Sequence, residues 1–387
     1  MTSTQQLVST GWPPVTADDA EHHIVYRRDD EFAAWPFYCG LWLTGDGSVV
    51  AGFKRVPTDY RDIDHYNLVT KPGEIVVIRS RDGGRTWDDD SVVPVHDMSI
   101  TSEGELPGGA SDDWASLPPL DFTSRDTLVM GGGIPRLMTS DGARAWVRAS
   151  SDGGRTWRPH RLLPNWDFPG ISMPGSSMYS VREDGVMLFG VHAWAPDGQN
   201  PLPIVYASED GSDFRYLGNI VPESPRSPYW PGGRFASAKH IYPRIIVLPD
   251  GRALASVRYE RDPRGLFWTE IHESLDGGRT WHWLSRVNDW GAPGDLVPLQ
   301  DGRVLCIYGY RLAPRRGIRY RVSEDQGRTW GREVILRDDG ATWDLGYPRA
   351  IEVEPGVVLT HYWMNLAEPG AGPEGGVRHI ACTRFRP

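Results

Sequence analysis

The octamer SRDGGRTW at residues 80–87 returns three times along the chain, as SSDGGRTW at 150–157, SLDGGRTW at 274–281 and SEDQGRTW at 323–330. A degenerate copy, SEDGSDF, occupies 208–214. The shared pattern is typical of a tight turn, because Asp accepts backbone N–H bonds across a loop, Gly adopts positive φ and Trp anchors the turn in a core. Several equivalent active sites in one chain would be unusual, so we interpret the octamers as repeated structural turns.

A second repeat precedes each octamer. It consists of an apolar run, a turn and another apolar run, and this pattern predicts a β-hairpin. The turn Asp and the octamer Asp are 26 residues apart in three units, as from Asp250 to Asp276, 24 in a fourth and 36 in the first. Each unit therefore predicts two hairpins in series, or four antiparallel strands. The inner hairpins occupy 41–53, 121–132, 178–190, 245–257, 296–309 and 350–362.

Six such units predict an all-β fold, a six-bladed β-propeller with four antiparallel strands per blade. The competing fold is a β-sandwich, which does not explain six copies of one double hairpin. The strand-like segment 23–28 has no unit of its own, so we expect it to complete the last blade, formed by 349–385, and to close the ring. This organisation assigns 1–22 to an N-terminal tail and 23–387 to a single propeller domain.

The composition indicates which kinds of partner and which cellular compartment to expect. The 387 residues include 41 Lys and Arg against 51 Asp and Glu, a net charge of −10, which disfavours nucleic acid. No apolar run approaches the roughly 18 residues of a membrane span, and the first residues lack the features of a secretory signal. Three cysteines, Cys39, Cys306 and Cys382, suit a reducing compartment and show no zinc-binding spacing. We expect a soluble cytoplasmic protein without a metal or other cofactor; its oligomeric state stays open.

Three long insertions are predicted to share one face of the propeller. In a four-stranded blade, the connection between strands two and three lies on the same face as the link to the next blade. By this count, the insertions at 56–73, 97–119 and 220–243 lie opposite the octamers. Long loops on a rigid scaffold are often functional. We therefore expect a binding site on that face.

Residues that begin a first strand or end a second strand surround the central channel on the same face. Converging arginines suit a carboxylate or sulfate, and aromatic rings suit the faces of sugars. A structural ion pair is an equal alternative for any single Arg, but the cluster as a whole predicts a site for an anionic sugar. The predicted substrate-binding set is Trp35, His192, Trp230, Tyr242, Arg244, Arg258, Tyr310, Arg311 and Arg349, and the insertions add Asp64, His65, Asp112 and Asp113.

The octamers match the Asp box of BNR-repeat proteins, and the chain resembles the sialidase (neuraminidase) superfamily of six-bladed propellers over roughly residues 23–385. DLGYPRAIEVEPG at 344–356 is similar to the sialidase stretch with the tyrosine nucleophile, which implies this role for Tyr347. YPRIIVLPDGRALASVR at 242–258 is similar to the stretch that ends in a carboxylate-binding arginine, which implies this role for Arg258. In the family, a carboxyl group in the loop before blade two is the acid/base, which implies Asp113, with Asp112 next.

A tyrosine nucleophile suits an acidic sugar, because the carboxylate of a sialic acid would repel Asp or Glu, whereas a phenol is neutral until a base takes its proton. The sequence departs from the family at two points. Tyr242 stands where sialidases have the Glu partner of the nucleophile. The region FAAWPFYCG at 32–40 lacks the Arg-Ile-Pro motif that carries the first carboxylate-binding Arg.

Three functions stay open at this point, all with a carbohydrate partner. The first is an exo-acting glycoside hydrolase of sialidase type, with Tyr347 as nucleophile and Asp113 as acid/base. The second is a polysaccharide lyase on uronate glycans, in which His65, His192 or Tyr310 transfers protons while Arg neutralises the carboxylate. The third is a glycan-binding propeller without catalytic activity.

Overall fold

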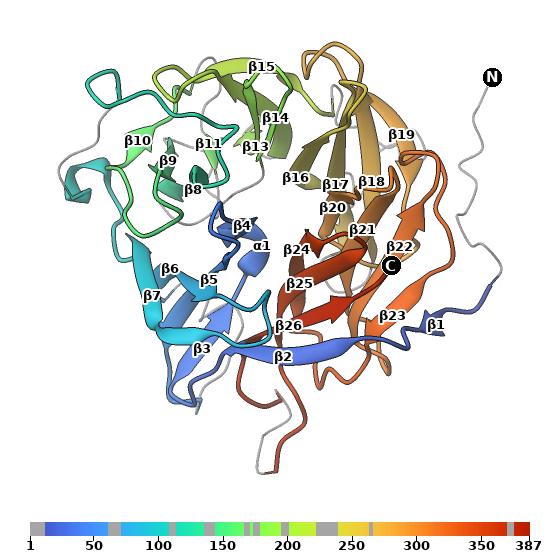
Figure 1. Cartoon of the computed structure of the whole chain (residues 1–387). Coiled ribbons are helices and arrows are strands. Elements are labelled where there is room, and N and C mark those ends of the chain that lie inside the picture. Colours follow the sequence, from blue (N-terminus) through green and yellow to red (C-terminus); the bar gives the residue numbers. More distant parts are fainter. Residues whose placement is uncertain are drawn as a thin grey trace, which may run out of the picture.

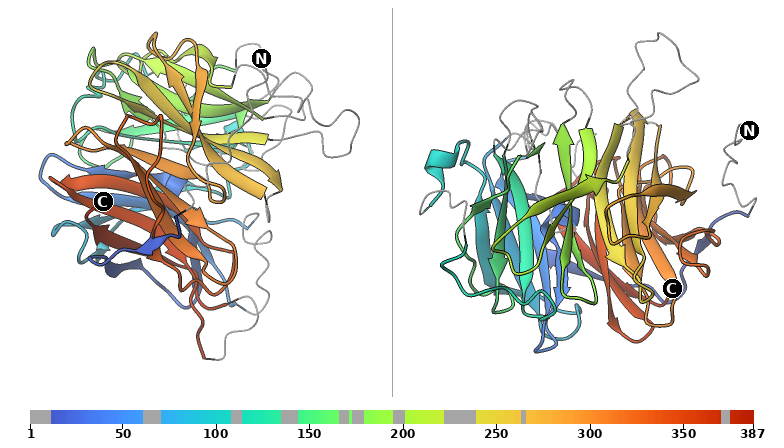
Figure 2. Two further views of the ribbon diagram at one scale, coloured as in Figure 1. Left: turned by 90° about the vertical axis from the view of Figure 1, so that its right-hand side faces the viewer. Right: turned by 90° about the horizontal axis from the view of Figure 1, so that it is seen from above.

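The computed structural model describes residues 12–60, 71–107, 114–134, 144–165, 171–172, 179–194, 201–221, 239–262, 266–369 and 375–387. Six sheets are arranged around a common axis, which Figure 1 views nearly end-on. The side views of Figure 2 show the strands running between the two faces of the ring. The predicted all-β six-bladed propeller is confirmed.

The blades follow one another in chain order. Blade one contains β3 (Glu31–Ala34), α1 (Pro36–Cys39), β4 (Leu41–Leu43), β5 (Val49–Pro57), β6 (Glu74–Ser80) and β7 (Asp88–Asp97). After the short 3-10 helix η1 (Glu103–Glu105), blade two contains β8 (Leu128–Ile134), β9 (Arg144–Ser150) and β10 (Arg161–Leu162). Blade three contains β11 (Ile171–Ser172), β12 (Tyr179–Val181), β13 (Met187–Trp194), β14 (Pro201–Ser208) and β15 (Arg215–Asn219).

Blade four contains β16 (Lys239–Val247), β17 (Ala253–Asp262), β18 (Leu266–Ser274) and β19 (His282–Arg286). Blade five contains β20 (Gly294–Pro298), β21 (Val304–Tyr310), β22 (Gly317–Ser323) and β23 (Val334–Arg337). Blade six contains β24 (Gly346–Glu354), β25 (Val357–Met364) and β26 (His379–Phe385). In the part of the chain that the structure describes, no helix is long and apolar enough to cross a membrane.

Two N-terminal strands lie on the outside of the ring. Strand β2 (Glu21–Tyr26) pairs antiparallel with β26, with His23 opposite Cys382, and so forms the outermost strand of blade six. Further upstream, β1 (Val15–Thr16) pairs in parallel with β23, the outer strand of blade five. The N-terminal segment therefore connects two neighbouring blades from the outside.

The inner strands differ from the regular four-stranded pattern in three blades. In blade one β3 and β4 both pair with β5, and in blade three β11 and β12 both pair with β13, so the innermost strand is divided. Blade two has three strands among the described residues, because its expected first strand forms a turn at residues 121–124. There the Asp121 side chain accepts hydrogen bonds from the Thr123 backbone N–H (2.9 Å) and hydroxyl (2.6 Å), which favours a turn over a strand.

The octamers are turns at one end of the blades. Asp276 accepts hydrogen bonds from the backbone N–H groups of Arg279 (3.0 Å) and Thr280 (2.9 Å), and the Trp281 ring is 2% exposed. The register places the octamers at the same end as the inner-hairpin turns, since Ser323 is opposite Val304 beside such a turn. In blade six, Gly346 and Trp363 are opposite each other at the other end of the hairpin. Residues at that end lie on the face away from the octamers.

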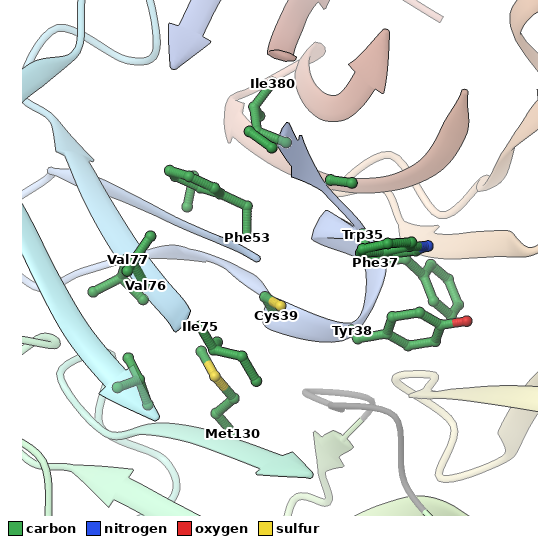
Figure 3. Packing of buried hydrophobic residues seen from close by; sticks show 14 of the residues in the cluster. Trp35, Phe37, Tyr38, Cys39, Phe53, Ile75, Val76, Val77, Met130 and Ile380 are labelled. Carbon is green, nitrogen blue, oxygen red and sulfur yellow. The ribbon is translucent and has the colours of Figure 1, made fainter. Parts of the chain in front are cut away.

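The blades pack through buried apolar side chains. The largest hydrophobic cluster, part of which Figure 3 shows, joins blade one to blade six through residues such as Phe53, Val76 and Ile380. The short helix α1 lies near the centre of the ring with β4 and β24 (Figure 1). This packing places side chains from α1 and the innermost strands against one another.

Candidate active site

Three aromatic residues near the axis have a left-handed backbone. They are Trp35 (φ 53°), Tyr242 (φ 63°) and Tyr347 (φ 51°), and each is followed by proline. Bulky residues avoid this conformation, which costs of order 1–3 kcal/mol and persists mainly where the surrounding structure enforces it. In blades four and six the strained tyrosine lies in a register shift of the inner strand, between Ile241 and Arg244 and between Gly346 and Arg349.

Three tyrosines from different blades meet on the face away from the octamers. The ring centroids of Tyr38 and Tyr242 are 5.2 Å apart, those of Tyr38 and Tyr347 5.4 Å, and those of Tyr242 and Tyr347 5.9 Å. Tyr38 belongs to α1, and Figure 3 shows its hydroxyl pointing away from Ile75 and Met130. All three side chains are buried. We call Tyr38, Tyr242 and Tyr347 the tyrosine cluster.

Two guanidinium groups flank Tyr347. Nη1 of Arg258 donates to the Tyr347 hydroxyl at 3.3 Å, while its Nη2 pairs with Glu260 at 2.6 Å. The guanidinium carbon of Arg311 lies 5.0 Å from the centroid of the Tyr347 ring, and its Nε donates to the Leu345 carbonyl at 3.1 Å. Nη2 of Arg311 is buried and has no hydrogen-bond partner in the structure. An unused donor of Arg311 therefore belongs to a guanidinium group that lies over the Tyr347 ring.

The charges around Tyr347 favour its ionised form. Burial raises the pKa of Tyr347, but the positive charges of Arg258 and Arg311 outweigh it, and the net pKa is lowered from 10. The hydrogen bond from Tyr38 acts in the same direction, whereas Glu260 opposes it. Burial raises the pKa of Tyr38 and of Tyr242 above 10. Tyr347 is thus the member of the tyrosine cluster most able to lose its proton.

Glu260 supplies a carboxylate that the sequence comparison with sialidases does not identify. It follows Arg258 by two residues on β17, so both side chains lie on the same face of the strand. The residue is 9% exposed, and the negative charge of its carboxylate raises the pKa of both Tyr242 and Tyr347. Although Tyr242 stands where the family has Glu, a carboxylate reaches the same cluster from the neighbouring strand.

Comparison with known proteins agrees with this architecture. The BNR repeat-like domain family matches residues 122–359, more than half of the chain. The chain belongs to this family. The fold is that of a sialidase-like BNR propeller.

Individual relatives are distant. A sialidase from Micromonospora viridifaciens is 24% identical over 322 residues, a match that spans 79% of this chain and 44% of that protein. A Dyadobacter fermentans protein of unknown function is similar with a TM-score of 0.70 at 23% identity, covering 97% of this chain and all of that one. The GH93 α-L-arabinofuranosidase of Fusarium graminearum, solved with arabinobiose, has a TM-score of 0.58 at 12% identity, with 96% and 98% covered. At these identities the structural matches describe the fold alone.

Two of the arginines predicted to bind substrate are engaged elsewhere in this BNR propeller. Oδ1 of Asp295 accepts from Nε of Arg244 and from Nη1 of Arg349, both at 2.8 Å. Asp295 lies on β20 with no solvent exposure, between the inner strands of blades four and six. Burial and the charge of Arg244 lower the pKa of Arg349 to about 10. The structure therefore makes Arg244 and Arg349 part of an ion-pair network between blades.

Two further residues predicted to bind substrate each have a cation over the ring. Trp35 packs against Phe32 and Trp363, at centroid distances of 5.3 Å and 5.0 Å, and the ammonium group of Lys54 lies 4.8 Å from its ring centre. Tyr310 ends β21 half-buried, and the Arg319 guanidinium stacks 3.3 Å from its centroid. One face of each ring is therefore covered by a cation, which limits the surface left for a sugar.

Of the remaining predicted residues, His192 has a described backbone, and five others lie outside the described residues. His192 lies on β13 opposite Ser172 of β11, and only its backbone is described. No group of three metal-ligating side chains occurs among the described residues. Asp64, His65, Asp112, Asp113 and Trp230 lie outside the described residues.

Sequence reasoning missed Tyr38, Glu260 and Lys54. Tyr38 belongs to a one-turn helix that interrupts an inner strand, and no motif marks that helix. Lys54 is 4% exposed on β5, and such burial is unusual for lysine. The residues next to it in the sequence do not predict this burial. Glu260 was recognisable in principle, because its i+2 spacing from Arg258 on a predicted strand places both side chains on one face.

Proposed function

We propose that this BNR propeller is an exo-acting glycoside hydrolase of sialidase type that acts on a glycan with an acidic sugar, with Tyr347 as nucleophile. One observation carries the proposal: the buried Tyr347 side chain lies beside two guanidinium groups, Arg258 at its hydroxyl and Arg311 over its ring, and Nη2 of Arg311 has no partner. Such a pair can both stabilise a phenolate and bind a carboxylate. The similar proteins include a sialidase and an α-L-arabinofuranosidase, names of enzymes that cleave glycosidic bonds.

In the proposed reaction the Tyr347 phenolate attacks the anomeric carbon while the bond to the leaving-group oxygen breaks. That oxygen takes a proton from an acid, for which we propose Asp113 in the insertion before blade two. Asp113 then accepts a proton from the water that cleaves the glycosyl–tyrosine bond, and Tyr347 returns to its phenolate form. Arg311 and Arg258 hold the sugar carboxylate, which lowers its repulsion of the incoming phenolate.

The decisive test is Tyr347→Phe, which removes one hydroxyl. We expect release of methylumbelliferone from 4-methylumbelliferyl N-acetylneuraminic acid to fall at least about 1000-fold, while the melting temperature stays nearly unchanged. Tyr308→Phe is the matched control, because the Tyr308 hydroxyl is bonded to Glu333 at 2.7 Å and lies outside the tyrosine cluster. Activity retained in Tyr347→Phe would exclude the proposed nucleophile.

The same geometry favours one second candidate, a lyase on uronate glycans. A tyrosine whose pKa is lowered could remove the proton next to the carboxylate, and Arg258 and Arg311 could neutralise that carboxylate. Product analysis separates the functions. A lyase produces an unsaturated uronate that absorbs in the ultraviolet, a hydrolase produces a saturated reducing sugar, and a binding protein leaves the glycan intact.

A further inference from the structure

The segment Tyr-Pro-Arg occurs twice at equivalent positions of the ring. Tyr242 to Arg244 lies in the inner strand of blade four, and Tyr347 to Arg349 lies in the inner strand of blade six. In both copies the tyrosine has positive φ, the strand has a register shift at the same place, and the arginine follows two residues later. Each copy delivers one tyrosine to the tyrosine cluster.

A glycine on the preceding blade accommodates each copy. A Cβ atom on Gly190 of blade three would lie 2.8 Å from the Pro243 carbonyl oxygen, and one on Gly309 of blade five would lie 3.0 Å from Cα of Gly346. Both glycines are on the second strand of their blade, β13 and β21. The backbone of Gly190 and that of Gly309 therefore lie directly against the two tyrosine segments, with no room for a side chain between them.

Asp295 joins the two copies from blade five. Its Oδ1 accepts from Arg244 and Arg349 at 2.8 Å each, and its Oδ2 accepts from the Ala350 backbone N–H at 2.7 Å. Nη1 of Arg244 continues the network by donating to the Tyr179 carbonyl at 2.8 Å. A single fully buried carboxylate thus holds the residues that follow both strained tyrosines.

We propose that Asp295 is a positioning residue that, through Arg244 and Arg349, holds Tyr242 and Tyr347 in their places in the tyrosine cluster. The catalytic importance of this position rests on the function proposed above for Tyr347, but the positioning itself does not. The strain of two left-handed tyrosines needs an opposing restraint, and a bonded carboxylate between two arginines provides one on both sides at once. Loss of Asp295 should therefore release both tyrosines together.

The pKa values of Tyr242 and Tyr347 measure whether both side chains have been released. The pKa of Tyr347 is lowered by Arg258 and Arg311, whereas burial raises that of Tyr242. If Asp295→Asn frees both side chains, both pKa values should move toward 10, that of Tyr347 upward and that of Tyr242 downward. If Asp295 acted only through its charge, its removal would leave more positive charge nearby and lower both values.

The experiment is a pH titration of the whole chain with 13Cζ-labelled tyrosine, followed by NMR, with Tyr347→Phe and Tyr242→Phe to assign the two signals. It needs no substrate, so its outcome stands whether or not Tyr347 is the nucleophile. The control is Glu273→Gln on the octamer side, since Glu273 also lies between two arginines, Arg252 at 2.5 Å and Arg328 at 3.8 Å. The control should leave both tyrosine titrations unchanged.

Two glycine variants test the same arrangement if Asp295→Asn does not fold. Gly309→Ala presses on the segment of Tyr347 and should shift only that titration, and Gly190→Ala should shift only that of Tyr242. With an active substrate, Asp295→Asn should lower kcat at least about tenfold while KM changes less than about threefold. Titrations that stay unchanged, or that both move downward in Asp295→Asn, would overturn the positioning role.

Discussion

A histidine pair between blades one and two makes stability depend on pH. Nδ1 of His96 on β7 lies 2.9 Å from Nε2 of His160, and both rings pack on Trp146. The two nitrogens share one proton in the neutral pair, so adding another places two N–H groups face to face. Burial and the charge of Arg148 lower the pKa of His96 to about 4, and burial with the charge of His96 lowers that of His160 to about 3.

The direction of this pH dependence follows from the pH at which the two histidines bind protons in the unfolded chain and in the folded chain. The unfolded chain binds protons at these histidines near pH 6.5, whereas the folded chain binds them only near pH 4 or below. Stability is therefore fully present above about pH 7 and is lost as the pH falls from about 6.5 toward 4. At pH 5 the loss relative to pH 7.5 amounts to about 2 kcal/mol for each imidazole.

The assay is chemical denaturation at pH 7.5 and pH 5.0 for the parent and for His160→Gln. Gln keeps a polar group beside His96 but does not titrate. We expect the parent to lose more free energy of unfolding than the variant over this interval, by roughly 2 kcal/mol. An equal loss in both proteins would show that the pair does not control this pH dependence, and the other buried histidines would then account for it.

Three further substitutions test the site and the octamers. Arg258→Lys keeps the charge but cannot bond Tyr347 and Glu260 together, so KM for the acidic methylumbelliferyl substrate should rise at least about tenfold in steady-state assays. Glu260→Gln removes a negative charge that raises the pKa of Tyr347, so the acidic limb of the pH–rate profile should move to lower pH, and an unmoved limb would contradict the assignment. Asp276→Ala leaves backbone donors such as the Thr280 N–H unsatisfied and should cost about 1–3 kcal/mol of stability in denaturant melts, with turnover preserved in the folded protein.

In the candidate site, the sequence predicted the positions of several residues but not the partners of their side chains. Tyr347, Arg258 and Arg311 were predicted from strand counting and family resemblance, and the structure brings them into contact. Arg244 and Arg349 satisfied the same criteria, yet their guanidinium groups bind Asp295. The strand pattern gives the end of a blade at which a residue lies, but it does not give the partner that its side chain finds on the next blade.

Strand counting also has limits within single blades. Blade two was expected to begin with a hairpin over 121–132, and a side-chain hydrogen bond from Thr123 to Asp121 forms a turn at its start instead of a strand. Tyr38 reaches the tyrosine cluster from a one-turn helix that begins at Pro36. Such local interruptions depend on the packing of particular residues around the axis. A repeat pattern describes only what the blades have in common, so it does not predict them.

The sequence by itself determined the repeating unit, the number of blades and the end of each blade at which the octamers lie. These properties are local, since Asp-Gly turns and alternating apolar runs act within about 30 residues. Only the tertiary structure decided which charged groups pair. Asp295 meets arginines 51 and 54 residues away along the chain, and Arg258 meets Tyr347 across 89 residues. Those contacts exist only once the blades have packed against one another, because they join inner strands from different blades.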